Sequence, residues 1–190
     1  MKVTHNAEIL VGDYQFADKV KEQVLSCLKF CNPIPQDNSN VKASIHTEWD
    51  WEPRNITFRN LREFVRGETE RHYKPGATSG GGRKMIYCES FWANVYEKGD
   101  YANSHCHKPY DYSFAYFVKT RWYYPPLIFS DSGKRVRPKE GRYVIFPSYL
   151  RHHVPKHRYN ESRITLSGNI FYKEVARDEW IDSKYETSLI

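Results

Sequence analysis

Three histidines are spaced in a way that could bind one metal ion. His105 and His107 flank Cys106, and in an extended segment residues i and i+2 lie on the same side, about 6.6 Å apart along the backbone. A third ligand must come from elsewhere, and His152, which follows the apolar run around Phe146, is the natural choice. Three imidazoles suit zinc, iron or copper, and an open coordination position would make such a site catalytic.

Other histidines leave the third ligand open. The chain has eight histidines in 190 residues, so an HxH pair alone is weak evidence for a metal. His153 and His157 follow His152 closely, but alternation along a strand turns His153 away from the side that His152 occupies.

A second group could bind a carboxylate. Arg163 begins a strand-like segment, and Thr165 lies on the same face two residues later. A guanidinium fork beside a hydroxyl matches the geometry of a carboxylate. The alternative is that Arg163 only covers the surface of a sheet with its aliphatic stem.

The second half of the chain predicts a sheet that would position these groups. Runs of β-prone residues, separated by turn residues, predict strands at Met85–Tyr96, Tyr112–Lys119, Leu127–Phe129, Arg142–Phe146 and Arg163–Tyr172. The last of these alternates: Ile164, Leu166, Gly168 and Ile170 share one face, and Arg163, Thr165, Ser167 and Asn169 share the other. The polar face would meet either solvent or a site.

The first half predicts helices. Apolar residues recur at steps of three and four from Val20 to Cys31 and from Leu61 to His72, and prolines follow both runs. Helices followed by strands indicate a mainly β (α+β) fold with an antiparallel sheet closing on itself and the helices packed outside. We expect one domain over 1–190, with a helical part at 1–78, a β core at 83–172 and a tail at 173–190 that is a docked helix or loose. The Ser79–Gly82 run predicts a mobile loop.

Composition excludes a membrane protein and leaves the partner open. No run of 18 apolar residues occurs, and the four cysteines form no CxxC pair, so we expect a cytoplasmic protein with reduced thiols. The net charge of +6 suits an anionic cosubstrate, a nucleic acid or solubility alone. The basic stretch Lys134–Lys139 is either a solvated hairpin tip or a docking site for a nucleic acid or an acidic protein, the first being favoured.

Two stretches resemble the iron(II) and 2-oxoglutarate dependent dioxygenases, in particular the small oxygenases of marine phages and bacteria. Phe91–His107 resembles the family's WxN-G-D-H-x-H segment, and Phe146–Pro155 with Arg163-Ile164-Thr165 resembles its FPxxxxHxV-R-x-S/T segment. The resemblance implies a double-stranded β-helix, or jelly roll, and a host-cytoplasmic location if the protein is phage-encoded. It also implies that His105, His107 and His152 bind Fe(II), while Arg163 and Thr165 bind the distal carboxylate of 2-oxoglutarate.

The resemblance implies further roles. Asn94 would help to hold the cosubstrate or would make a structural hydrogen bond, and Tyr116 is a weaker candidate. The implied reaction is hydroxylation of a C–H bond in a protein, peptide or small molecule, with a peptidyl, prolyl-type substrate suggested by the prolyl hydroxylases, and with ascorbate as a stimulant. Apart from the resemblance, Trp49–Pro53 could help to shape the substrate mouth, or its two tryptophans could belong to the core.

The second ligand departs from the wider superfamily, which uses two histidines and one carboxylate. Asp111 is the first carboxylate after His105, six residues on, but only a turn at Pro109 could bring it close, so we keep His107. A neutral ligand in place of an anion leaves the site more positive. Two other functions therefore stay open: a non-catalytic, cupin-like metal-binding module, and a three-histidine dioxygenase that uses no 2-oxoglutarate.

Overall fold

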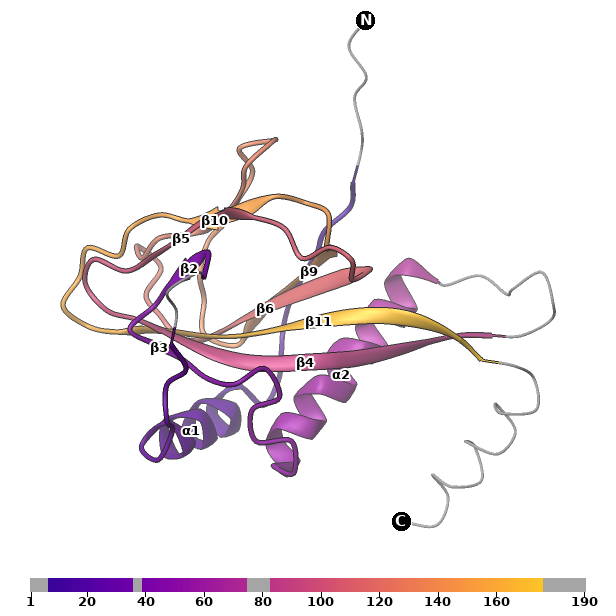
Figure 1. The fold of residues 1–190 in the computed structure, drawn as a ribbon, viewed down its shortest axis with the longest axis horizontal. Helices are drawn as coiled ribbons and strands as arrows, with labels where there is room; N and C mark the ends of the chain where they lie inside the picture. Colours follow the sequence, from indigo (N-terminus) through magenta and orange to yellow (C-terminus); the bar gives the residue numbers. More distant parts are fainter. Residues whose placement is uncertain (1–6, 36–38, 75–82, 176–190) are drawn as a thin grey trace, which may run out of the picture.

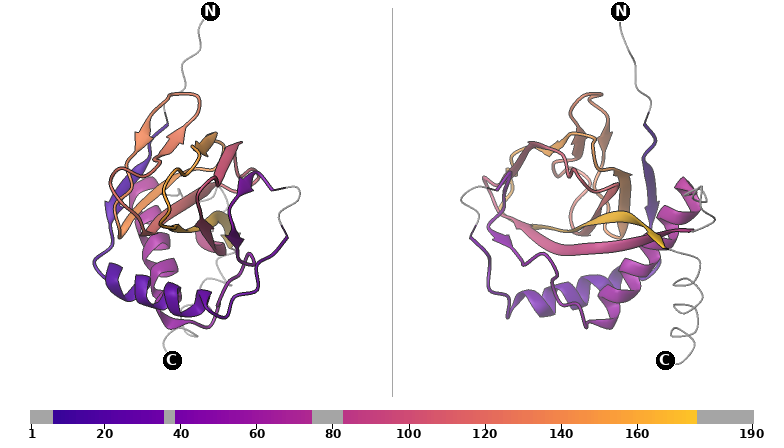
Figure 2. Two further views of the ribbon diagram at one scale, coloured as in Figure 1. Left: turned by 90° about the vertical axis from the view of Figure 1, so that its left-hand side faces the viewer. Right: turned by 45° about the vertical axis from the view of Figure 1, so that its right-hand side comes forward.

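The structure, a computed structural model, describes residues 7–35, 39–74 and 83–175. Within these ranges the chain forms two α-helices and eleven β-strands, and the strands make two antiparallel sheets that face each other (Figures 1 and 2). The helices lie against the outer side of the larger sheet. The chain is therefore mainly β, with N-terminal helices packed outside a double-stranded β-helix, as predicted.

The larger sheet contains six strands and provides most of the site. Its order is β1 (Leu10–Asp13), β9 (Arg142–Pro147), β6 (Tyr112–Lys119), β11 (Arg163–Val175), β4 (Arg83–Tyr96) and β3 (Ile45–His46). β4 and β11 are the longest strands and pair along their whole length. Their register sets Arg163 opposite Tyr96 and Thr165 opposite Asn94.

The smaller sheet brings two of the histidines together. Its order is β2 (Val41–Lys42), β5 (Tyr101–His105), β10 (His152–Val154), β7 (Leu127–Phe129) and β8 (Arg135–Val136). β10 pairs with β5 so that His152 is the direct cross-strand partner of His105. Residues 47 positions apart in sequence thus become neighbours by backbone pairing alone.

The two helices bury their apolar residues beneath the larger sheet. α1 (Ala17–Leu28) buries Val20 and Val24, and α2 (Ile56–Tyr73) buries Phe58, Leu61 and Val65, which belong to the same apolar cluster as Phe91 and Leu166 of the sheet. The Asn55 side chain caps α2 by accepting hydrogen bonds from the N–H groups of Thr57 and Phe58. These buried faces fix the larger sheet from outside and leave its inner face for the site.

Period-two alternation separates the two faces of the central strands. On β11, Ile164, Leu166 and Ile170 belong to the core under the helices. Arg163, Thr165, Ser167 and Asn169 face the opposite way and line a cavity between the sheets. The polar face therefore meets a site and not bulk solvent.

The predicted strands are observed with small changes in their bounds, whereas six strands were missed. The missed strands are two to five residues long and carry little periodicity: β1, β2, β3, β5, β8 and β10. Three of them lie in the part predicted to be helical, 1–78, so that part is not purely helical. The loop predicted at Ser79–Gly82 and the tail beyond residue 175 lie outside the described residues, and the assignment of 1–190 to one domain stays a prediction. In the described part of the chain, no helix combines the length and apolar character that crossing a membrane requires.

The close packing of β11 against its neighbouring strands can be tested by a substitution at Gly168. A Cβ atom at Gly168 would clash with the Ser90 carbonyl oxygen and the Phe114 ring. Because the carbonyl belongs to the paired strand and cannot rotate away, we predict that Gly168→Ala lowers the free energy of unfolding by about 1–3 kcal/mol in urea denaturation.

Gly67, in the middle of α2, is the matched control. The nearest atom to a Cβ there is the flexible end of Arg71, 4.0 Å away. Gly67→Ala should therefore stabilise the protein by about 0.5–1 kcal/mol. Equal effects of the two substitutions would contradict this description of the packing.

Candidate functional site

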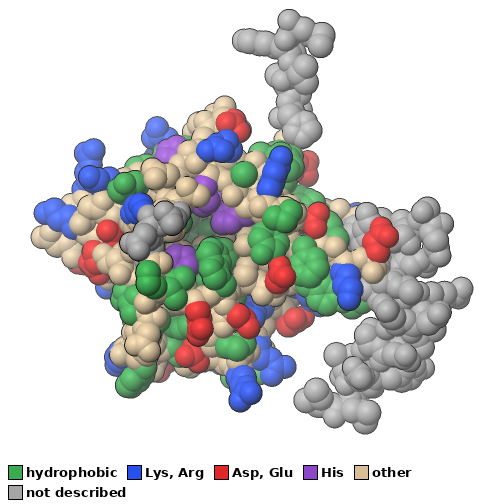
Figure 3. Space-filling model, in the orientation of Figure 1, with side chains coloured by type: hydrophobic (Ala, Val, Ile, Leu, Met, Phe, Trp, Pro, Cys, Tyr) green, Lys and Arg blue, Asp and Glu red, His purple; other side chains and the backbone are tan. Residues whose placement is uncertain are grey.

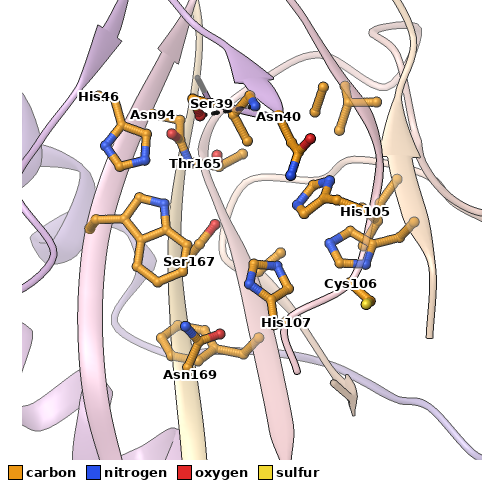
Figure 4. Close-up of a pocket in the computed structure, with 18 of the residues that line it drawn as sticks. Ser39, Asn40, His46, Asn94, His105, Cys106, His107, Thr165, Ser167 and Asn169 are labelled. Carbon is orange, nitrogen blue, oxygen red and sulfur yellow. Dashed lines mark hydrogen bonds between the residues drawn. The ribbon is translucent and has the colours of Figure 1, made fainter. Parts of the chain in front are cut away.

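The candidate site is a cavity of about 540 Å³ between the two sheets. Several histidine side chains are visible close together on the face of the molecule shown in Figure 3. The cavity is lined by all six site residues proposed from the sequence: Asn94, His105, His107, His152, Arg163 and Thr165. Segments far apart in the sequence therefore converge on one enclosed volume (Figure 4).

The three histidines form a cluster that could hold a metal. One ring nitrogen from each of His105, His107 and His152 lies within 4.8 Å of the other two. Nitrogens bound to one ion at about 2.1 Å lie roughly 3–4 Å apart, so small rotations of the rings suffice. Among the described residues no carboxylate or cysteine joins this cluster.

Hydrogen bonds orient two of the three rings. His105 Nδ1 lies 2.7 Å from the Asn103 carbonyl oxygen, and His152 Nδ1 lies 2.9 Å from that of Leu150. A carbonyl oxygen only accepts, so each neutral ring carries its proton on Nδ1 and has a lone pair on Nε2. This is the arrangement by which proteins fix the tautomer of a metal-binding histidine.

Burial keeps the cluster neutral. Desolvation, and secondarily the neighbouring histidines, lower the pKa of His107 to about 3. The same causes lower the pKa of His152 to about 4. Neutral imidazoles are the form that binds a cation, so the site is ready for a metal at neutral pH.

Arg163 is a buried cation in the wall of the same cavity. Its side chain is 2% exposed, and its guanidinium lies over the rings of Tyr96 and Phe117, at 5.0 and 5.5 Å from their centroids. Its Nε and Nη1 have no hydrogen-bond partner among the described residues. Desolvation lowers the pKa of Arg163, because no protein carboxylate compensates its charge. Such a group fits an anionic ligand.

A row of polar side chains crosses the inner face of the larger sheet beside Arg163. Cross-strand pairing aligns Thr165 with Asn94 and Asn94 with His46. Asn94 is 2% exposed, and its Oδ1 has no partner in the described part of the chain. The alternative role of Asn94 was a structural hydrogen bond. Its Oδ1 makes no such bond to a described residue, so this oxygen can accept a hydrogen bond from a ligand.

His46 was not predicted, and it forms one wall of the cavity with two tryptophans. Its ring stacks on Trp92 at 6.2 Å and contacts the edge of Trp49 at 5.1 Å. Its Nδ1 bonds to the Thr47 carbonyl oxygen at 2.7 Å, and burial lowers its pKa, so Nε2 is a hydrogen-bond acceptor. Figure 4 shows His46 across the cavity from His105 and His107.

Several alternatives from the sequence lie away from the cluster. The Asp111 carboxylate accepts a hydrogen bond from the Tyr172 N–H, and His153 Nδ1 lies 3.0 Å from Ser130 Oγ. Tyr116 belongs to the core under the helices and does not line the cavity. In the basic stretch, Lys134 and Arg135 are exposed at the β7–β8 hairpin, and Lys139 pairs with Asp13.

The missed residues gave little sequence signal. His46 belongs to a two-residue strand, and its position opposite Asn94 depends on a register that a strand so short does not reveal. Trp49 was considered for the substrate mouth, but nothing in the sequence distinguishes it from the other tryptophans. Only the fold shows that this exposed side chain lines the cavity.

Comparison with known proteins agrees with this geometry. Residues 128–169, which include His152, Arg163 and Thr165, match a family described as "Putative 2OG-Fe(II) oxygenase". Among curated proteins, none matches the sequence.

Three solved structures share the fold at low sequence identity. The viral collagen prolyl hydroxylase vCPH from Paramecium Bursaria Chlorella virus-1, in complex with 2OG, has a TM-score of 0.64 and 12% identity over 85% of this chain and 94% of that one. A prolyl-4-hydroxylase of Pseudomonas putida has a TM-score of 0.58 and 14% identity over 88% of this chain and 93% of that one. HygX from Streptomyces hygroscopicus, with nickel and 2-oxoglutarate bound, has a TM-score of 0.61 and 10% identity over 87% of this chain and 83% of that one.

The family match covers three of the six candidate site residues, His152, Arg163 and Thr165. The structural neighbours share the fold that carries the site. Residues 128–169 therefore resemble the 2OG-Fe(II) oxygenase family, for whose members Fe(II) and 2-oxoglutarate are the implied cofactor and cosubstrate, and the histidine cluster lies in a fold that these solved structures share.

Proposed function

We propose that His105, His107 and His152 hold Fe(II), that Arg163 and Thr165 bind the far carboxylate of 2-oxoglutarate, and that the enzyme hydroxylates a C–H bond of a prolyl-type peptidyl substrate. The observation that carries this proposal is the buried guanidinium of Arg163, with no anionic partner among the described residues, in the same cavity as three neutral imidazoles. The cavity is thus complementary to a ligand that is a dianion and can also bind a metal.

The charges of the site favour 2-oxoglutarate over a neutral ligand. Three imidazoles bring no negative charge, so an Fe(II) ion held by them keeps its full double charge. No Asp or Glu is present among the described residues that line the cavity. A dicarboxylate would compensate the metal with one end and Arg163 with the other, which also explains how a ligand set without a carboxylate is tolerated.

The residues of the chain position and protect the reaction. Bound Fe(II), with 2-oxoglutarate and dioxygen, supplies the oxidation of C–H to C–OH, with release of succinate and carbon dioxide. The Nδ1 hydrogen bonds of His105 and His152 aim their Nε2 lone pairs at the ion. Arg163 and Thr165 fix the orientation of the cosubstrate, Asn94 offers a further hydrogen bond, and the aromatic walls exclude water.

The residues of the wall opposite the histidine cluster favour a neutral substrate that carries a ring. Trp92 and Trp49 offer indole surfaces, and His46 Nε2 would accept a backbone N–H. The absence of acidic residues from the described lining disfavours a polycationic small molecule. A peptide with a prolyl residue fits these features, because the prolyl ring would pack on the indoles and the N–H of a neighbouring non-proline residue would donate to His46. Two of the structural neighbours are prolyl hydroxylases.

The metal site is tested by turnover. We predict that purified protein with Fe(II), ascorbate, 2-oxoglutarate and a (Pro-Pro-Gly)₅ peptide releases succinate and adds 16 Da to the peptide. His152→Ala should lower the rate of succinate release at least about 100-fold, because it removes a ligand. An equal rate in the variant would refute the assignment. Oxygen uptake without 2-oxoglutarate would select a keto-acid-independent dioxygenase instead.

The carboxylate receptor is tested by binding. We predict that Arg163→Met raises the Kd for 2-oxoglutarate at least about 30-fold in calorimetric titrations of the Ni(II)-loaded protein, since a buried charge pair is lost. The fold should persist, because a neutral side chain relieves the cost of burying a cation. Arg158→Met, at an exposed arginine outside the cavity, is the control, and equal Kd values in both variants would contradict the assignment.

The substrate wall is tested by comparing two exposed tryptophans. Trp49→Ala should raise KM for the peptide about 3- to 30-fold without changing the Kd for 2-oxoglutarate, because an aromatic contact worth about 1–2 kcal/mol is lost. Trp122, which is 72% exposed and lies outside the cavity, provides the control Trp122→Ala. An unchanged KM in Trp49→Ala would show that the substrate binds elsewhere.

A further inference from the structure

His107 differs from the other two histidines in how it is held. His105 and His152 each bond through Nδ1 to the carbonyl oxygen two residues earlier. The His107 ring makes no hydrogen bond to any described residue, and it packs against the rings of His105, His152 and Trp92. His107 also lies beyond β5, which ends at His105. Its direction must therefore come from the backbone that carries it.

Ser148 fixes that backbone. The His107 N–H donates to the Ser148 carbonyl oxygen at 2.8 Å, and the Ser148 N–H donates to the Asp111 carbonyl oxygen at 2.9 Å. Both backbone groups of Ser148 therefore bind the loop 107–111, one at each end. This single residue joins the loop of His107 to the turn that leads from β9 into His152.

The Ser148 side chain anchors this junction in the larger sheet. Ser148 is 0% exposed, and its Oγ lies 2.7 Å from Ser113 Oγ on β6. The Ser113 hydroxyl donates to Asn169 Oδ1 on β11 at 3.0 Å. Because the Ser113 proton is used there, the Ser148 hydroxyl donates to Ser113. Asn169 and His107 both line the cavity (Figure 4), so the chain of hydrogen bonds links two parts of its lining.

We propose that Ser148 is the positioning residue of His107, with Ser113 and Asn169 as its anchor, and that this buried network replaces the ring hydrogen bond which His107 lacks. The inference rests on the proposed metal site. The physical reason is that a loop is softer than a strand, so the third ligand needs an attachment to the rigid sheet. In metal sites, loss of a supporting hydrogen bond weakens metal binding about 10- to 100-fold.

The test is a titration of the untagged protein with Co²⁺ alone, followed by its visible absorption. Ser148→Ala and Ser113→Ala should each raise the Kd for Co²⁺ about 10- to 100-fold and change the intensity of the absorption bands, since both break the same hydrogen bond. Two variants guard against one failing to fold. Thr69→Val removes a buried hydroxyl that donates to the Val65 carbonyl oxygen in α2, far from the cavity in the fold, and should leave the Kd within twofold.

A second comparison shows whether Ser148 acts through His107. In a His107→Ala background, the further change Ser148→Ala should alter the Kd for Co²⁺ less than twofold, because the ligand it positions is gone. The inference is overturned if Ser148→Ala weakens binding equally in both backgrounds, if Thr69→Val weakens it as much, or if Ser148→Ala and Ser113→Ala bind like the wild type. Failure of the wild type to bind Co²⁺, or unchanged binding by His152→Ala, would instead refute the proposed metal site on which the inference rests.

Discussion

A positive charge buried between two sheets, with no anion beside it among the residues that the structure describes, is the constraint on which this site depends. Burying a cation is unfavourable unless a partner compensates it, and in the described part of the chain Arg163 is compensated by the faces of Tyr96 and Phe117, not by an anion. The fold tolerates this because β11 is paired on both sides and cannot turn its residues outward. The guanidinium is therefore held ready for a carboxylate that arrives from outside the chain.

The histidine cluster complements the buried charge of Arg163 in the same cavity. The pairing of β5 with β10 sets His105 opposite His152, and the loop after β5 brings in His107. Burial keeps the rings neutral, so they offer lone pairs and no charge. A bound dianion would therefore reduce the net positive charge of the metal and the guanidinium together, which would tie the metal site and the cosubstrate site to each other.

The sequence predicted the elements whose signal lies in long runs. Alternation along Arg163–Asn169 identified the cavity face of β11, and the spacing of His105, His107 and His152 identified the cluster. Six strands were missed because two to five residues show little period, and their existence depends on partners distant in the chain: β1, β2, β3, β5, β8 and β10.

The supporting residues were beyond prediction for a related reason. His46 becomes a wall of the cavity only through its pairing with Asn94, and Ser148 acts through its backbone as much as through its hydroxyl. A serine in a turn and a histidine in a two-residue strand look ordinary in sequence. Their roles come from tertiary register, which composition and periodicity do not encode.

The most direct test of the central claim is a crystal structure of the protein soaked anaerobically with Fe(II) and 2-oxoglutarate. We predict one iron about 2.1 Å from a ring nitrogen of each of His105, His107 and His152. The far carboxylate of 2-oxoglutarate should lie about 2.7–2.9 Å from the Arg163 guanidinium. Iron bound away from these three rings, or a cosubstrate whose carboxylate does not reach Arg163, would contradict it.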